Sequence, residues 1–283
     1  MAGGSVLWFR HGLRLHDNPA LLYALQDRTK PFYPIFIFDG ETAGTNLVGY
    51  NRMRFLLESL NDLDNQFKQV GGRLLLFRGK PDILIRRLWE EFGISQLAFE
   101  QDCEPVWLPR DNSVKALCRD IGVQCTEHVS HTLWNPASVI EANGGIPPLT
   151  YQMFLHTVDT IGLPPRPVED IDFSNVKFGK IPQSLREIFK MFDKIPMIRW
   201  KGGETTALLM LNSRLQVEKE NCRDHFLNFK NNTRNFDKSK NYRNFPIITK
   251  CADQKRFLKL YNKPFILYIS ISTFPFIPYF PLC

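Results

Sequence analysis

The sequence predicts an α/β fold built on a five-stranded parallel sheet that is doubly wound in the Rossmann manner. Short apolar runs alternate with helical patterns over about 130 of the 283 residues. The first run, residues 6–9 (VLWF), is continuously apolar, which is typical of a strand covered on both faces. Parallel strands need long right-handed crossovers, and the helical patterns between the runs supply them.

A charged turn follows the first predicted strand. Asn18 is placed to cap a helix, and Pro19 then occupies the first helical position, where no backbone donor is needed. Ligands of open α/β sheets bind at the carboxyl ends of strands, so cations here could meet a phosphate or a carboxylate. Taken singly, each of these charges is more simply read as solvating the turn. They are Arg10, His11, Arg14 and His16.

The later elements of the sheet domain follow from their patterns. Apolar residues at three- and four-residue spacing predict a helix over residues 53–67. Another helix begins at Pro81 and is closed by Gly93, and a third covers residues 112–121. The further strands are predicted at residues 32–39, 73–77, 97–101 and 123–128.

Four segments are predicted along the chain: an α/β domain over residues 1–134, a connector over 135–197, the start of a helical domain over 198–220, and a tail over 221–283. The connector holds several prolines and the Gly144-Gly145 pair, which argue against long regular elements there. In the third segment, Gly202-Gly203 break the chain before the apolar face of a helix.

The net charge of +7 is concentrated in the tail. Residues 221–263 hold 11 Lys and Arg against 3 Asp, a balance of +8, which leaves −1 for the rest of the chain. The basic character therefore belongs to the tail, and the near-neutral body argues against nucleic-acid binding. The tail is rich in residues with A- and T-rich codons, so we expect it to be disordered or derived from a retained intron or an unsupported gene-model extension. The alternative is a genuine basic tail for nucleic acid or anionic lipid, but the tail lacks a helical basic face.

The cysteines and the chain ends indicate a reducing compartment. No C-x-x-C pair and no histidine at ligand spacing accompanies the six cysteines, so free thiols are expected and a metal site is not. The first residues lack a signal peptide pattern. The apolar stretch 265–274 is followed at once by prolines and falls short of the roughly 20 residues that span a bilayer, so no membrane segment is expected.

Several motifs resemble the cryptochrome/photolyase family. The order W-F-R-x-x-L-R-L-x-D-N-P-A-L, from Trp8 to Leu21, is similar to its amino-terminal signature. Residues 49–60 and 99–105 are similar to its second helix and to its fourth strand with the following loop. The stretches 129–134 and 144–156 most resemble the light-sensing cryptochromes of insects. The matches cover roughly the first 165 residues and return at the W-x-G-G-E-x-x-A-L motif that begins at Trp200.

The resemblance implies a connector that leads into an all-helical domain holding FAD. Only the start of that domain is expected here, so the FAD site and the photoreducing tryptophans would lie beyond position 220 and be missing. In photolyases the cleft above the sheet can house an antenna folate or deazaflavin. Folate-binding relatives place an Asn-Glu pair where this chain has Val106-Trp107, which argues against such an antenna.

Four residues are the candidates for lining that cleft. Arg10, Asp39 and Glu104 follow the first, second and fourth predicted strands, and Arg52 lies in the second helix. The alternative is that these residues form ion pairs that fix loops, because structural networks also cluster charges. No catalytic residue is assigned.

The function implied by the resemblance is that of a truncated blue-light photoreceptor of the cryptochrome type. Such a receptor uses FAD, binds circadian clock proteins in a light-dependent way, and works in the cytoplasm and nucleus; the chain is not expected to be light-competent by itself. One alternative is a DNA photolyase, a light-driven enzyme that repairs pyrimidine dimers. The other is an interaction module that competes for cryptochrome partners and needs no cofactor.

Overall fold

The computed structural model describes residues 3–40, 49–102, 104–182 and 200–232. The chain divides into two compact units, one that includes the sheet and ends its described part at Glu204, and one that begins at Thr205. Each is described by itself. The predicted tail, apart from residues 221–232, lies outside the described residues.

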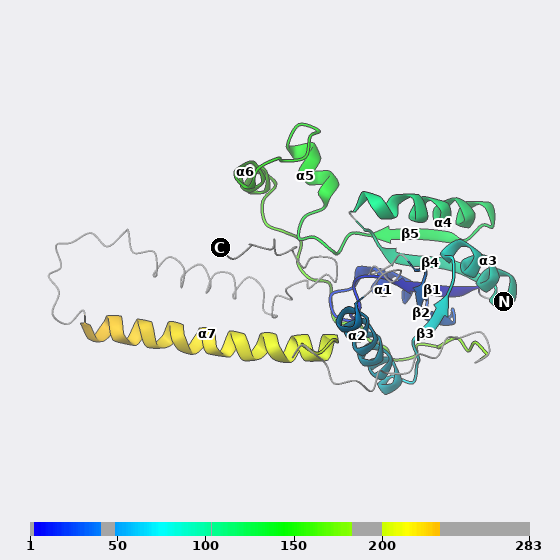
Figure 1. The fold of residues 1–283 in the computed structure, drawn as a ribbon, viewed down its shortest axis with the longest axis horizontal. Helices are drawn as coiled ribbons and strands as arrows, with labels where there is room; N and C mark the ends of the chain where they lie inside the picture. Colours follow the sequence, from blue (N-terminus) through cyan, green and yellow to red (C-terminus); the bar gives the residue numbers. More distant parts are fainter. Residues whose placement is uncertain (1–2, 41–48, 103, 183–199, 233–283) are drawn as a thin grey trace, which may run out of the picture. The chain divides into compact units, whose positions relative to one another are not determined.

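The sheet has five parallel strands in the order β3-β2-β1-β4-β5, which confirms the predicted α/β fold (Figure 1). Four of the five strands start one to three residues away from the predicted positions, and the structure gives a cause for two of these shifts. The third strand starts later, because the Leu74 N–H donates to the Asp64 side chain instead of to the ladder. The fourth starts earlier, because Ile94 pairs with Gly4. The strands are β1 (Gly4–Phe9), β2 (Phe32–Phe38), β3 (Leu75–Arg78), β4 (Ile94–Glu100) and β5 (Gln124–His128).

Helices cover both faces of the sheet. Leu7 and Phe9 of β1 pack in one core cluster with α1 (Pro19–Ala24) and α2 (Tyr50–Gln69). The alternate residue Trp8 packs in a second cluster with α3 (Pro81–Phe92) and α4 (Leu108–Asp120). Every residue of β1 is buried, as expected for a strand covered on both sides.

The local signals that were predicted for the helices are present. The Asn18 side chain accepts a hydrogen bond from the Leu21 N–H, and Pro19 is the first residue of α1. Gly93 ends α3 in the left-handed conformation, with φ 58°. The helix predicted at 112–121 starts earlier, at Leu108, because Pro109 fits its first turn.

The connector is more regular than its prolines and glycines suggested. It contains α5 (Pro136–Ala142) and α6 (Tyr151–Ile161), whose side-chain caps are Asn135 and Thr150. Pro136 is harmless because it occupies the first turn, where the missing N–H has no helical partner. Gly144 and Gly145 both have positive φ and form the turn between the helices. The prediction that long elements are absent was therefore wrong for α6.

After α6 the chain returns to the sheet. We call residues 171–178 the strap. Its Phe173 and Phe178 contact the ring of Phe67 on α2, each with centroids 6.1 Å apart. The backbone of Phe32 closes the contact, since its N–H donates to Lys177 and its carbonyl accepts from Gly179, both at 2.8 Å. The strap thus completes the core cluster beneath α2.

The second unit begins within α7 (Glu204–Asn232), which runs past the predicted limit of residue 220. Residues 221–232 contain neither Gly nor Pro, so nothing in the sequence stops the helix there. Within the described ranges, no helix combines the length and apolarity needed to cross a bilayer.

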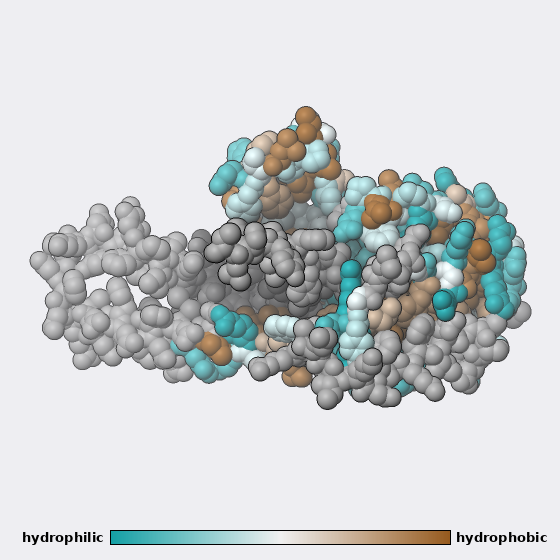
Figure 2. Space-filling model, in the orientation of Figure 1, coloured by the Kyte–Doolittle hydropathy of each residue, from teal (hydrophilic) through white to brown (hydrophobic). Residues whose placement is uncertain are grey.

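Apolar side chains are exposed on the hairpin of α5 and α6. Figure 2 shows hydrophobic residues gathered over this part of the molecule. Leu149 is 81% exposed and Leu163 is 72% exposed, and Ile146 and Leu155 are exposed as well.

Candidate functional site at the carboxyl ends of β1 and β4

The winding of the sheet reverses between β1 and β4, because β2 and β3 lie on one side of β1 and β4 and β5 on the other. In open α/β sheets the crevice at such a switch point is where ligands bind. Arg10 directly follows β1, Glu100 is the last residue of β4, and Asp102 follows it. We call the charged cluster around these residues the switch-point site.

Arg10 is the centre of the switch-point site and is 1% exposed. Its Nη1 donates to both carboxylate oxygens of Asp111 at 2.6 Å, and its Nη2 donates to the carbonyl oxygen of Glu100. The guanidinium also lies over the rings of Phe99 and Trp8, 4.6 and 5.2 Å from their centroids. Burial lowers the Arg10 pKa and Asp111 opposes that shift, and the guanidinium stays charged.

Asp39 joins the same network through Arg110 of α4. Its Oδ2 is 3.2 Å from Nη1 of Arg110, whose Nη2 is 3.0 Å from Asp111. The Arg110 guanidinium lies over Trp8 and Trp107, 5.2 and 4.9 Å from their centroids. Two carboxylates and two guanidinium groups therefore alternate between the ends of β1 and β2 and the first turns of α4.

The other two predicted residues have different surroundings. Glu104 precedes η2 (Pro105–Trp107), a 3₁₀ turn, and its carboxylate accepts the Trp107 indole N–H at 3.2 Å. Arg52 lies in the first turn of α2 and is exposed. Of the four candidates, the structure brings Arg10 and Asp39 together through their partners, whereas Glu104 closes its own turn.

A second group of charges surrounds the Glu100 carboxylate, which is 5% exposed. Its Oε1 is 2.7 Å from Nη2 of Arg14 and accepts the Ser130 hydroxyl, while its Oε2 is 3.7 Å from Nε2 of His131. Burial pushes the Glu100 pKa upward, but Arg14, His131 and Ser130 outweigh it and the net pKa is lowered. Glu100 is therefore held as a carboxylate.

The two histidines beside this carboxylate differ in their surroundings. Burial, more than any nearby charge, lowers the His131 pKa. The His11 Nε2 lies 3.0 Å from Oδ2 of Asp102, and its ring centroid is 5.5 Å from that of Trp107. Burial raises the Asp102 pKa and the hydrogen bond from His11 lowers it, with a net lowering.

Some buried polar atoms of the switch-point site are left over. Trp8 Nε1 and Arg10 Nε have no hydrogen-bond partner among the described residues. Buried donors are almost always satisfied in proteins, so a water or a polar ligand atom is expected beside them. The ion pairs of the site hold its charged side chains in fixed positions. Among the described residues of the site, no side chain is activated as a nucleophile.

Comparison with known proteins decides the family. The sequence of residues 5–170 matches the DNA photolyase family. The chain belongs to the cryptochrome/photolyase family. It is 52% identical to Cryptochrome-1 of Anopheles gambiae over 249 residues, which covers 80% of this chain and 46% of that protein. The chain thus spans less than half the length of this insect relative, and the insect Cryptochrome-1 proteins are the type it resembles.

Solved photolyase structures share the fold. The crystal structure of a bacterial class III photolyase from Agrobacterium tumefaciens superposes with a TM-score of 0.63 at 24% identity, over 75% of this chain and 44% of that one. An archaeal photolyase from Sulfolobus tokodaii, solved with two FAD molecules, superposes with a TM-score of 0.56 at 21% identity, over 73% and 45%.

Members of the cryptochrome/photolyase family bind FAD, but the switch-point site does not fit a flavin. Its buried charges are paired with one another, and the Arg10 guanidinium is packed against Phe99 and Trp8. The leftover donors Trp8 Nε1 and Arg10 Nε can bind a water or a small polar group. The residues present do not form a cradle for a flavin ring, and the antenna role of the four candidates stays a prediction.

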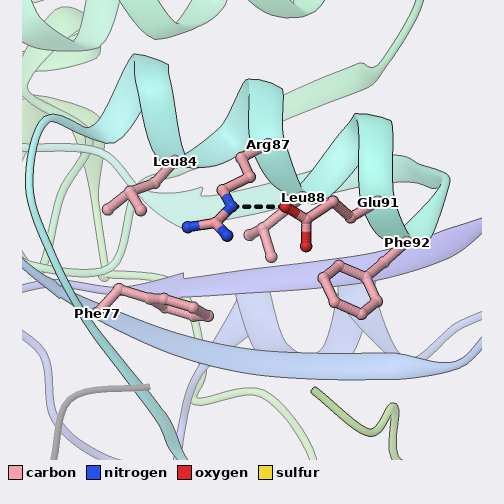
Figure 3. A pocket seen from close by; sticks show the side chains of 6 residues that line it. All are labelled: Phe77, Leu84, Arg87, Leu88, Glu91 and Phe92. Carbon is pink, nitrogen blue, oxygen red and sulfur yellow. Dashed lines mark hydrogen bonds and ion pairs between the residues drawn. The ribbon is translucent and has the colours of Figure 1, made fainter. Parts of the chain in front are cut away.

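A hollow lies between α3 and β3 (Figure 3). Its walls are the apolar side chains of Phe77, Leu84, Leu88 and Phe92. The two charged residues at its rim, Arg87 and Glu91, pair with each other at 2.6 Å. It is a packing gap between a helix and a strand with no group aimed into it for chemistry.

Sequence reasoning missed most partners in the switch-point site. Arg110 and Asp111 follow the motif at residues 99–105, but nothing local in the sequence marks them as partners of Arg10 and Asp39. Ser130 and His131 come from the loop after β5, which parallel pairing with β4 brings to Glu100. Among the described residues, no group of three or more His, Cys, Asp or Glu side chains is placed to hold a metal ion.

Proposed function

We propose that these residues form the α/β part of a blue-light receptor of the insect cryptochrome type, which uses FAD and signals by light-dependent binding to circadian clock proteins. The similarity to an insect Cryptochrome-1 supports this most directly. The family match ends at residue 170, but the match to this relative covers 80% of the chain. A stretch of that length includes the Gly202-Gly203-Glu204 turn wherever it begins in the chain. The likeness therefore includes the start of the helical part. By the same resemblance the receptor works in the cytoplasm and nucleus.

The flavin of this receptor is bound outside the switch-point site, and the 283-residue chain alone is not light-competent. The paired charges of Arg10, Asp111 and Glu100 favour this reading, since they fill the place where an α/β sheet ordinarily takes a ligand. The DNA photolyase alternative is less favoured because residues outside the tail are near neutral, whereas DNA binding is driven by basic surface.

The test is the visible absorption of the purified chain after incubation with FAD and removal of free cofactor. A folded, colourless protein is expected, with folding checked by circular dichroism. Bound oxidised flavin would overturn the proposal that the 283-residue chain alone is not light-competent.

A pull-down of recombinant clock proteins then separates the receptor from the interaction module. Binding in darkness without FAD would contradict the receptor reading and favour a cofactor-free module. Absence of binding by the colourless chain, with light-dependent binding by the full-length Cryptochrome-1 of Anopheles gambiae as the positive control, is the expected result.

A further inference from the structure

The loop between β1 and α1 is held by a residue far along the chain. The two carboxylate oxygens of Glu204 accept the backbone N–H groups of Leu15 and His16, each at 2.9 Å. Glu204 is 9% exposed, although it is the first residue of a long helix. An acidic residue at that position ordinarily serves its own helix. Here both oxygens serve a loop 188 and 189 residues away in sequence.

Glu204 is itself placed by α2. The Gly202 N–H donates to Oε2 of Glu58 at 2.9 Å, and Oε1 of Glu58 is held by Arg54 at 2.8 Å. A Cβ at Gly202 would lie 2.2 Å from the Phe55 carbonyl oxygen, so only glycine lets the turn approach the helix this closely. Gly203 has φ 118°, which a side chain would resist. The double glycine therefore seats the turn on α2 and fixes where the Glu204 carboxylate lies.

The same loop carries Arg14 into the switch-point site. The Arg14 Nη2 lies 2.7 Å from Oε1 of Glu100 and donates to the Asp17 carbonyl oxygen at 3.0 Å. The Arg14 carbonyl oxygen accepts from Nδ2 of Asn18. Asp17 has φ 48°, a conformation that non-glycine residues rarely adopt, and its carboxylate accepts the Val168 N–H. Leu15 and His16, the residues held by Glu204, directly follow Arg14.

We propose that Glu204 is the positioning residue of the switch-point site: by holding Leu15 and His16 it keeps Arg14 on Glu100, so the site depends on the turn that opens the helical part. Glu204 touches none of the charged groups of the site and acts only through the loop. The proposal concerns this chain's own residues and stands whether or not the receptor function is correct.

Hydrogen exchange of backbone amides tests the first step. In Glu204→Ala both loop amides lose their acceptor, and in Glu204→Gln one oxygen remains. Loss of a bond to a charged acceptor predicts exchange about tenfold faster or more at Leu15 and His16 in the alanine variant, with the glutamine variant between it and the unsubstituted chain. Glu220→Gln, an exposed carboxylate on the same helix bonded to Gln216, is the matched control and should leave the loop unchanged.

Titration of His131 by NMR tests the second step, with the resonance assigned through His131→Asn. The charged and titratable groups that act on His131 are Glu100, Arg14, His11 and Asp102. Arg14 disfavours the protonated imidazole, so its departure from Glu100 raises the His131 pKa. Arg14→Met removes that charge directly and gives the reference shift.

The proposal expects Glu204→Gln and Glu204→Ala to move the His131 pKa upward, toward the value in Arg14→Met. Faster loop exchange with an unmoved His131 titration would overturn it, because Glu204 would then pin the backbone without positioning Arg14. Unchanged exchange at Leu15 and His16 in the glutamine variant, together with unchanged titration, would overturn it as well. If the alanine variant does not fold, the glutamine variant alone decides.

Discussion

Arg10 and Asp111, which are 101 residues apart in sequence, form an ion pair at 2.6 Å in which neither side chain is more than 5% exposed. The pair joins the end of β1 to the first turn of α4, and Arg110 extends it to Asp39 at the end of β2. Buried ion pairs contribute little net free energy when intact but leave an uncompensated charge when broken. The pair therefore makes the fold intolerant of losing either partner.

Asp111→Ala is expected to lower the free energy of unfolding by about 3–5 kcal/mol, because the Arg10 charge is left buried without its counter-ion. Urea denaturation followed by circular dichroism measures the change. Glu91→Ala, which breaks an exposed pair with Arg87 on α3, is the control and should cost less than about 1 kcal/mol. Equal effects of the two substitutions would show that Arg10 finds another partner.

Acid is expected to destabilise the sheet unit through Glu100. Its pKa is lowered in the folded state, so its contribution to stability is present above the ordinary value of 4.5 and is lost as the pH falls below that value through the lowered pKa. Unfolding free energies measured from neutral to acid pH should show this loss. In Glu100→Gln the curve should be flatter in that range; an unchanged slope would mean that other carboxylates carry the acid sensitivity.

Protonation of His131 is also expected to destabilise the fold, at a pH closer to neutral than the pH at which Glu100 is protonated. Burial lowers the pKa of His131 below its ordinary value of 6.5, so the fold favours the neutral ring. A proton then binds the unfolded chain more tightly, and stability falls as the pH drops through 6.5 toward the lowered pKa. His131→Asn should remove part of that slope in the same unfolding series. A slope that survives intact would assign it to His128, whose pKa burial also lowers.

Gly72→Ala is expected to destabilise the chain by about 1–3 kcal/mol through crowding. A Cβ at Gly72 would lie 2.3 to 2.5 Å from ring atoms of Phe178 in the strap. Gly49→Ala is the control, since a Cβ there meets nothing within 4 Å.

The double variant Gly72→Ala with Phe178→Ala gives the decisive comparison. Removing the Phe178 ring also removes its clash with the alanine Cβ at position 72. The stability lost in the double variant should therefore be smaller than the sum of the losses in the two single variants. Simple additivity in thermal unfolding would show that the strap does not press on Gly72.

The sheet was predictable because burial on both faces leaves a direct mark on sequence, as in the apolar run that became β1. The connector helices were harder to predict, since prolines dominate their surroundings. Asn135-Pro136 nevertheless repeats the cap signal of Asn18-Pro19, and Thr150 supplies another. The partners in the switch-point site could not be found locally: Arg10 meets Asp111 only after the strand order is set, and Glu204 meets Leu15 only after the double glycine turns the chain.

The position of the strap in the sequence determines when the core around Phe67 can be completed during synthesis. Phe173 and Phe178 complete the cluster around Phe67, yet they are made long after β1 and α2 have left the ribosome. A nascent chain that has reached β5 holds all five strands but still exposes the side of Phe67 that the strap will cover. During that interval the growing chain exposes an aromatic surface that is prone to aggregation, of the kind that chaperones bind.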